Sequence, residues 1–271
     1  MKPPTLTLAV CTLDADLQRA EAVFADLAPI GGVEYLILSQ GDGTPGRRHY
    51  TNTRGARIGI VTSASQGLSK NRNIALSEAS GDRVWFLDND VEITNSDITR
   101  LLDEIKTHNA DIHVCRIRCS DCDGVYKDYG RRRDGLLGLL RVSSIEIIAD
   151  RHKLADNGIR FNESLGLGTA FPSGEENLLL IHAWCAGLRF HFSPATLVAH
   201  PCLLEERQPR QAWRNPGMLR SKGIIARQIG GWRGVALCLW WGARALRYTG
   251  SAMAPLRVLD GFLRDSRRVT R

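Results

Sequence analysis

Short apolar runs alternate with amphipathic segments along most of the chain. Strands are predicted by the apolar runs at residues 6–11, 35–38, 58–61, 84–87 and 145–149. Helices are predicted by apolar residues at helical spacing over residues 14–27, 68–79, 97–108 and 176–186. Strands that alternate with helices indicate an α/β fold, in which a mostly parallel, Rossmann-like sheet carries helices on both faces.

Polar residues follow several of these predicted strands. In parallel sheets of this kind the ligand binds beyond the carboxyl ends of the strands. The residues that we expect at this edge are Thr12, Asp14, Gln40, Asp42, Asp88 and Asp90. Residues 115–138 are rich in charge and glycine instead, and we expect an irregular, mobile loop there.

The distribution of charge divides the chain into two parts. Of the 271 residues, 43% are hydrophobic and 24% are charged, which excludes a mostly disordered protein and allows a sizeable core. The net charge of +7 is uneven, because residues 1–205 carry a net −4 and residues 206–271 a net +11. We therefore predict a folded domain over 1–205 and a basic tail over 206–271.

The seven cysteines are scattered, and no targeting segment precedes the first predicted strand, so we expect reduced thiols in the cytoplasm. Cys115, Cys119 and Cys122 form a C-x3-C-x2-C pattern with His113 and Asp121 close by. Zinc sites usually have four ligands in recognisable pairs, and this cluster has no second pair. Zinc binding and idle thiols are both left open, with idle thiols favoured.

The strongest local feature is the sequence Asp88-Asn89-Asp90 at the end of a buried strand. Carboxylates that converge there could bind a divalent ion, since Mg²⁺ and Mn²⁺ prefer oxygen ligands. The alternative is that both aspartates only cap the turn and the next helix.

The order of several motifs is more specific than any one of them. Around Asp88-Asn89-Asp90 the chain carries, in order, Gly67-Leu68-Ser69-Lys70-Asn71-Arg72-Asn73, Gly166-Leu167-Gly168-Thr169, Ser173-Gly174-Glu175-Glu176-Asn177 and His200-Pro201. This series, over residues 5–201, resembles the family-two glycosyltransferases, which have the nucleotide-sugar-binding glycosyltransferase A fold. The resemblance implies that residues 1–205 form a catalytic domain.

The resemblance also implies roles on the donor side. Asp90, the last carboxylate of the Asp-x-Asp signature, would hold a Mn²⁺ or Mg²⁺ ion that bridges the donor's diphosphate, with Asp88 beside it. Arg72 would lie near the nucleotide and diphosphate, and His200 would be an additional metal ligand. Simpler roles stay open: Arg72 could be a scaffold residue paired with an aspartate, and His200 a packed imidazole.

On the acceptor side, the resemblance assigns the general base to Glu176, the second residue of the acidic pair with Glu175. Acidic residues are also favoured at a helix start by the macrodipole, so the pair alone would not establish catalysis. Many relatives have Asp in place of Glu176. Many also have an Asp pair where this chain has Gln40 and Asp42, so the nucleotide base is left open, and Asp14 and Asp42 could be simple turn residues.

These residue types suit an inverting transfer. A divalent ion stabilises the diphosphate leaving group, Arg72 offers a fork of donors to phosphate, and one carboxylate deprotonates the acceptor hydroxyl. The resemblance points to synthesis of a bacterial surface polysaccharide on a saccharide or lipid-linked acceptor. In the predicted loop, Arg131, Arg132 and Arg133 could grip an anionic acceptor or be a solvated charge run.

The basic tail contains an amphipathic stretch. Arg233, Arg244 and Arg247 fall within about 60° of one another on a helix and leave a wide apolar face that includes tryptophan and leucine. Such a helix suits an anionic membrane surface and would place the protein at the inner face of the cell membrane. The same face could instead pack on the protein itself or on a dimer partner.

Two other functions compete with this interpretation. A nucleotidyltransferase would also use carboxylates and a divalent ion, but it needs no acidic pair at an acceptor-side helix. A nucleic-acid-binding protein would use the basic tail, and its binding would weaken steeply with salt. The acidic body of the chain and the ordered acidic motifs argue against nucleic acid as a partner.

Overall fold

The computed structural model describes residues 5–41, 43–123, 126–129, 135–202 and 213–264. The chain divides into two compact units. The first contains Met1–Gln66, Lys70–Arg160 and Ala183–Cys202, and the second contains Gly67–Ser69, Phe161–His182 and Leu203–Arg271. The boundary between residues 205 and 206 falls outside the described residues and stays a prediction.

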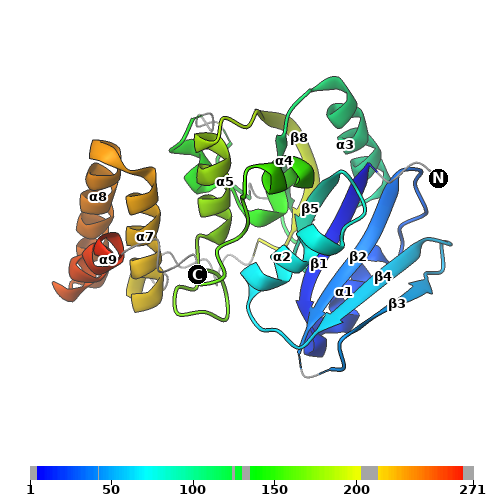
Figure 1. Cartoon of the computed structure of the whole chain (residues 1–271), viewed down its shortest axis with the longest axis horizontal. Coiled ribbons are helices and arrows are strands. Elements are labelled where there is room, and N and C mark those ends of the chain that lie inside the picture. Colours follow the sequence, from blue (N-terminus) through cyan, green and yellow to red (C-terminus); the bar gives the residue numbers. More distant parts are fainter. Residues whose placement is uncertain (1–4, 42, 124–125, 130–134, 203–212, 265–271) are drawn as a thin grey trace. The chain divides into compact units, whose positions relative to one another are not determined.

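The first unit is built on one eight-stranded sheet with the strand order β3-β4-β2-β1-β5-β7-β6-β8 (Figure 1). The strands are β1 (Leu6–Leu13), β2 (Val33–Gln40), β3 (Gly46–Thr51), β4 (Arg57–Ser63), β5 (Arg83–Leu87), β6 (Ile112–Cys119), β7 (Ile147–Asp150) and β8 (Phe190–His200). Strand β3 pairs antiparallel with β4, and β7 runs antiparallel to both of its neighbours, whereas the other pairs are parallel. The predicted α/β class with a mostly parallel sheet is confirmed.

Helices alternate with these strands, as the sequence predicts. They are α1 (Leu17–Phe24), α2 (Leu68–Glu78), α3 (Asn95–Thr107), α4 (Arg151–Asp156) and α5 (Glu175–Cys185). Helix α3 begins after Thr94, whose hydroxyl accepts the Asp97 N–H at 3.2 Å while the Asp97 carboxylate accepts the Thr94 N–H at 3.0 Å. This capping box fixes the start of the helix. Phe24 of α1 and Leu101 of α3 join the same buried cluster as alternate residues of β1.

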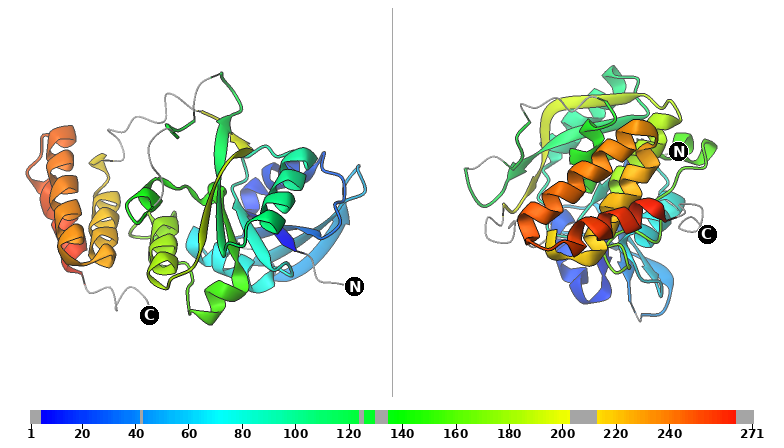
Figure 2. Two further views of the ribbon diagram at one scale, coloured as in Figure 1. Left: turned by 90° about the horizontal axis from the view of Figure 1, so that it is seen from above. Right: turned by 90° about the vertical axis from the view of Figure 1, so that its left-hand side faces the viewer.

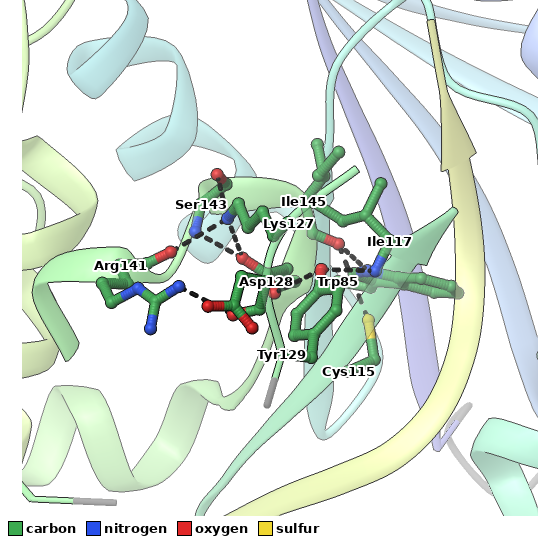
Figure 3. Close-up of polar contacts among 10 residues, drawn as sticks. Trp85, Cys115, Ile117, Lys127, Asp128, Tyr129, Arg141, Ser143 and Ile145 are labelled. Carbon is green, nitrogen blue, oxygen red and sulfur yellow. Dashed lines mark hydrogen bonds and ion pairs between the residues drawn. The ribbon is translucent and has the colours of Figure 1, made fainter. Parts of the chain in front are cut away.

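Residues 115–119 belong to a strand, which corrects this part of the expected mobile loop. Strand β6 ends at Cys119, and Lys127 and Tyr129 beyond it contact a buried carboxylate (Figure 3). Glu146 is fully buried, forms an ion pair with Lys127 and accepts the hydroxyl of Tyr129 at 3.1 Å. Because a buried carboxylate is costly without partners, these contacts hold the segment in place. Arg131, Arg132 and Arg133 lie outside the described residues.

The cysteines depart from the expectation that all are reduced. Cys119, at the end of β6, and Cys202, just after β8, are joined as a disulfide, with their Cα atoms 5.3 Å apart. Cys115 lies apart from them in the core and donates its thiol to the Ile145 carbonyl oxygen at 3.9 Å. The sequence predicts neither the pairing nor the involvement of Cys202, because Cys202 lies 83 residues from Cys119.

In the second unit, helices α7 (Pro216–Ile229), α8 (Gly231–Thr249) and α9 (Met253–Leu263) lie side by side (Figure 2). Gly223 of α7 and Gly261 of α9 allow a close crossing, since a Cβ atom at either would collide with the backbone of the other helix. No helix among the described residues has both the length and the apolar character that crossing a membrane requires.

Histidine 113, on β6, makes stability depend on pH. Burial, with a smaller effect of His191, lowers the pKa of His113 to about 3. The unfolded chain takes up this proton near pH 6.5, but the folded chain does so only near pH 3, so acid favours unfolding between these values.

We therefore expect His113→Met to flatten the fall in unfolding free energy between pH 6 and pH 4, by up to about 1.4 kcal/mol per pH unit. Urea denaturation at several pH values measures this slope. The exposed His152, replaced by Asn, is the matched control, and an unchanged slope in His113→Met would contradict the assignment.

Candidate functional site

The carboxyl ends of β1 and β2 are tied together by one buried side chain. Asn71, in α2, donates its amide to the Leu38 carbonyl oxygen at 2.9 Å and to the Thr12 carbonyl oxygen at 3.3 Å. The Thr12 hydroxyl in turn accepts the side-chain amide of Asn89 at 2.9 Å. Thr12, a predicted site residue, therefore connects the end of β1 to the segment after β5.

Asp14 lies directly beside the end of β2. Its carboxylate accepts hydrogen bonds from the Ser39 hydroxyl and, at 3.2 Å, from the Gly43 N–H. A Cβ atom added at Gly41 would lie 2.5 Å from this carboxylate, so a larger residue there would displace the Asp14 side chain. Gln40, at the end of β2, donates its side-chain amide to the Ser65 hydroxyl at 2.8 Å. Asp42 lies outside the described residues.

Beyond β5, Asp88 pairs with a buried arginine. A guanidinium nitrogen of Arg72, which is 1% exposed, lies 3.1 Å from Asp88 Oδ1. Removal from water raises the pKa of Asp88 and the Arg72 charge opposes that shift, but the net direction is upward. Burial also raises the pKa of the neighbouring Cys11 thiol to about 12, so Cys11 stays protonated and is a poor nucleophile.

Asp90 faces His200 across the edge of the sheet, with Asp90 Oδ1 3.3 Å from His200 Nε2. Two backbone hydrogen bonds hold this pairing, because Glu92 and Ala199 exchange N–H to carbonyl bonds of 2.9 Å in each direction. The His200 hydrogen bond, acting against partial burial, lowers the pKa of Asp90. Burial acts to lower the pKa of His200, but Asp90 and the Pro201 carbonyl oxygen outweigh it and raise that pKa.

The polar atoms of this pair fit a divalent cation. Asp90 Oδ1 is buried, and His200 Nε2 lies 3.3 Å from it. A buried carboxylate is costly unless a positive charge, such as a protonated imidazole or an ion, is paired with it. Asp88 is close enough to interact electrostatically with both Asp90 and His200. Carboxylates are ligand types that Mn²⁺ and Mg²⁺ accept, so Asp90 with Asp88 nearby is the candidate position for such an ion.

The acidic pair begins helix α5, where the sequence predicts a helix from residue 176. Glu175 is 6% exposed and Glu176 is half-buried. Gly166 has a φ of +100°, and a Cβ atom there would lie 3.2 Å from the Glu175 carboxyl carbon and 2.8 Å from Ser69 Oγ. Gly166 therefore makes room for the Glu175 side chain within the second unit.

Lys222, on α7, is an electrostatic neighbour of Glu176 that sequence patterns do not reveal. Burial lowers the pKa of Lys222, and the charge of Glu176 acts in the opposite direction. The Lys222 ammonium also lies over the rings of Trp213 and Trp241, 4.8 and 5.3 Å from their centroids. The start of α5 thus combines a carboxylate with a cation held between aromatic rings.

The structure brings most of the predicted donor-side residues together at one edge of the sheet in the first unit, and the acidic pair belongs to the second unit. The positioning roles of Asn71 and of the Glu92–Ala199 bridge are not predicted from the sequence. Asn71 belongs to one of the ordered motifs, but the motif does not reveal its hydrogen-bond partners, and the bridge joins residues 107 positions apart in the chain.

Comparison with protein families matches residues 33–174 to the family described as glycosyl transferase family 2. The matched region is just over half of the chain and includes Arg72 and the Asp88-Asn89-Asp90 sequence.

Individual relatives agree with this match. The uncharacterised glycosyltransferase EpsJ of Bacillus subtilis (strain 168) is 32% identical over 109 residues, which cover 38% of this chain and 28% of the length of EpsJ. The crystal structure of S. aureus TarS 1–349 has a TM-score of 0.62 at 14% identity, covering 95% of this chain and 91% of that chain. The complex of TarS 1–349 with UDP-GlcNAc gives the same values. At this identity the TarS structures show a shared fold.

Proposed function

The chain belongs to glycosyl transferase family 2 and is a glycosyltransferase. From that premise we propose that it catalyses an inverting, metal-dependent transfer of a sugar from a nucleotide-diphosphate donor to a hydroxyl acceptor. The observation that carries the proposal is the pairing of the buried Asp90 Oδ1 with His200 Nε2 at 3.3 Å. UDP-GlcNAc is the first donor to test, since the TarS complex contains it.

On the donor side, Asp90, Asp88 and His200 would hold the Mn²⁺ or Mg²⁺ ion. When bound, the ion supplies positive charge that stabilises the diphosphate as it leaves. Arg72 supplies a fixed cation beside Asp88, and its burial keeps the guanidinium in place without reorganisation during the reaction. Thr12, Asp14 and Gln40 line the ends of β1 and β2, where the nucleoside would bind.

On the acceptor side, Glu176 accepts the proton of the attacking hydroxyl, and Glu175 positions the start of α5. One base, with a leaving group that needs no protonation, gives a single displacement and inverts the configuration of the sugar carbon. A glycosidase needs a second carboxyl group as acid or nucleophile, and no residue in this proposal fills that role.

The C-terminal helices supply a membrane-facing surface in this proposal. One face of α8 packs inward through Cys238, Trp241 and Ala245. A second face, about 120° around the helix from the first, exposes an apolar stripe that is about 60° wide. The stripe consists of Trp232, Val235, Leu239 and Leu246, which are 77%, 47%, 68% and 45% exposed.

The stripe lies beside a run of cations, Arg233, Arg244 and Arg247, on the same helix. Apolar side chains next to arginines suit the headgroup region of an anionic membrane. Peripheral attachment at the inner face of the cell membrane would bring the enzyme to a lipid-linked or saccharide acceptor. As the family resemblance implies, this setting fits synthesis of a bacterial surface polysaccharide.

Asp90→Ala tests the metal assignment. We expect Mn²⁺ to tighten binding of UDP to the wild-type chain at least tenfold and to have no effect on the variant, because the bridging ligand is lost. Isothermal titration with and without Mn²⁺ measures both affinities, and the exposed Asp156→Ala is the matched control. A variant that keeps the Mn²⁺ dependence would eliminate Asp90 as a metal ligand.

Glu176→Gln tests the base. We expect turnover to fall about 10²- to 10⁴-fold, because the amide cannot accept the proton, while donor affinity is unchanged. Release of UDP from UDP-GlcNAc, and of nucleoside diphosphate from a panel of other nucleotide sugars, measures turnover. Glu78→Gln, at the end of α2, is the control. Turnover retained in Glu176→Gln would rule the residue out as base.

The double variant Trp232→Ser and Leu239→Ser tests the membrane surface. Each substitution removes an apolar side chain worth about 1.5–3 kcal/mol of burial, so partition onto vesicles that contain phosphatidylglycerol should fall at least tenfold. Co-sedimentation measures it, and Leu13→Ser, at an exposed residue of the first unit, is the control. Undiminished binding would refute the role, as would stronger binding to DNA than to vesicles.

A further inference from the structure

Three cysteines and an aspartate converge beyond the paired ends of β6 and β8. The ligand atoms of Cys119, Asp121, Cys122 and Cys202 all lie within 4.8 Å of one another. Cys119 is the last residue of β6 and is paired in the ladder with His200, the last residue of β8, two positions before Cys202. The cluster therefore forms where the two strands leave the sheet.

We propose that these four residues form a structural zinc site. Zinc in structural sites takes four ligands in a tetrahedron, with zinc–sulfur distances near 2.3 Å and zinc–oxygen distances of about 2.0–2.2 Å. Two sulfur ligands of such an ion are about 3.8 Å apart, so four ligand atoms confined within 4.8 Å can surround one ion. Three thiolates and one carboxylate would complete the coordination without a water molecule.

The spacing of the ligands supports zinc. Cys119 and Cys122 have the C-x2-C spacing that is common in zinc sites, and Cys202 supplies the ligand from a distant part of the chain. Asp121 Oδ1 accepts the backbone N–H of Cys202 at 2.6 Å, which fixes the carboxylate beside the third cysteine. The other carboxylate oxygen is then the ligand, and the hydrogen bond orients it.

A disulfide between Cys119 and Cys202 accounts for only two of the four groups. The disulfide does not use the Cys122 thiol or the Asp121 carboxylate, whereas a single ion would bind all four groups. The chain is synthesised with thiols, so zinc capture and oxidation compete for the same pair. Zinc binding needs no electron transfer, and each thiol that ligates the ion releases one proton.

The site would act on the catalytic edge by positioning. Ser120 donates its N–H to the His200 carbonyl oxygen at 3.1 Å, so the segment between two of the ligands already contacts the histidine that faces Asp90. An ion bound by Cys119, Asp121 and Cys202 would fix both the end of β6, which pairs with His200, and the residues that follow His200. The zinc would thus restrict the backbone of His200 without touching the donor or the acceptor.

Zinc content of the full chain, purified with reductant and supplied with zinc, tests this proposal. We expect one zinc ion per chain in the wild type and in Cys185→Ser, a control at another exposed cysteine. Cys122→Ser and Asp121→Asn should bind zinc at least tenfold more weakly in competition with a chelating indicator. Both residues are exposed, so neither substitution disturbs the core.

Cobalt in place of zinc distinguishes this site from the one at Asp90, because only thiolate ligands give sulfur-to-cobalt charge-transfer absorption. We expect that absorption in the wild type and in Asp90→Ala, and its loss in Cys122→Ser. Reduced wild-type chain that binds no zinc would overturn the proposal and leave the disulfide as the function of Cys119 and Cys202. Zinc affinity unchanged in Cys122→Ser would overturn it equally, and neither result depends on glycosyl transfer.

Discussion

The pairing of Asp90 with His200 depends on two strands that are far apart in the sequence and meet at one backbone bridge. The mutual hydrogen bonds between Glu92 and Ala199 bring the segment after β5 against the end of β8. Without that bridge the carboxylate and the imidazole would have no common position. The central strands supply the rigid base, because β1 and β5 are paired along the full length of β5 and are buried.

Around this pair, the neighbouring charges give the two carboxylates, Asp88 and Asp90, different acidities. Asp88 is balanced by the buried Arg72, while Asp90 is the more acidic carboxylate because His200 stabilises its negative form. One carboxylate is paired with an arginine and the other with an imidazole, and such carboxylates and cations can bind a metal ion and an anionic ligand together. In our proposal the cation is the metal ion and the anionic ligand is the diphosphate. The zinc site restricts the backbone of His200 through the neighbouring Ser120.

Sequence patterns predicted the central strands and their helices because each carries a local signal of apolar spacing. They missed β3, an edge strand whose residues Arg47, Arg48 and His49 are exposed and show no apolar alternation. They also missed β6, because Arg116 and Arg118 interrupt its apolar residues. The Asp90–His200 pairing, the Cys119–Cys202 pairing and the Lys222–Glu176 proximity join distant parts of the chain, and no local pattern encodes them. The ordered motifs located the acidic residues, but only through resemblance to a family.

A crystal structure of the chain with Mn²⁺ and UDP tests the central claim most directly. The account predicts an anomalous manganese peak within coordination distance of Asp90 and of a diphosphate oxygen. A manganese peak bound elsewhere in the chain would contradict it.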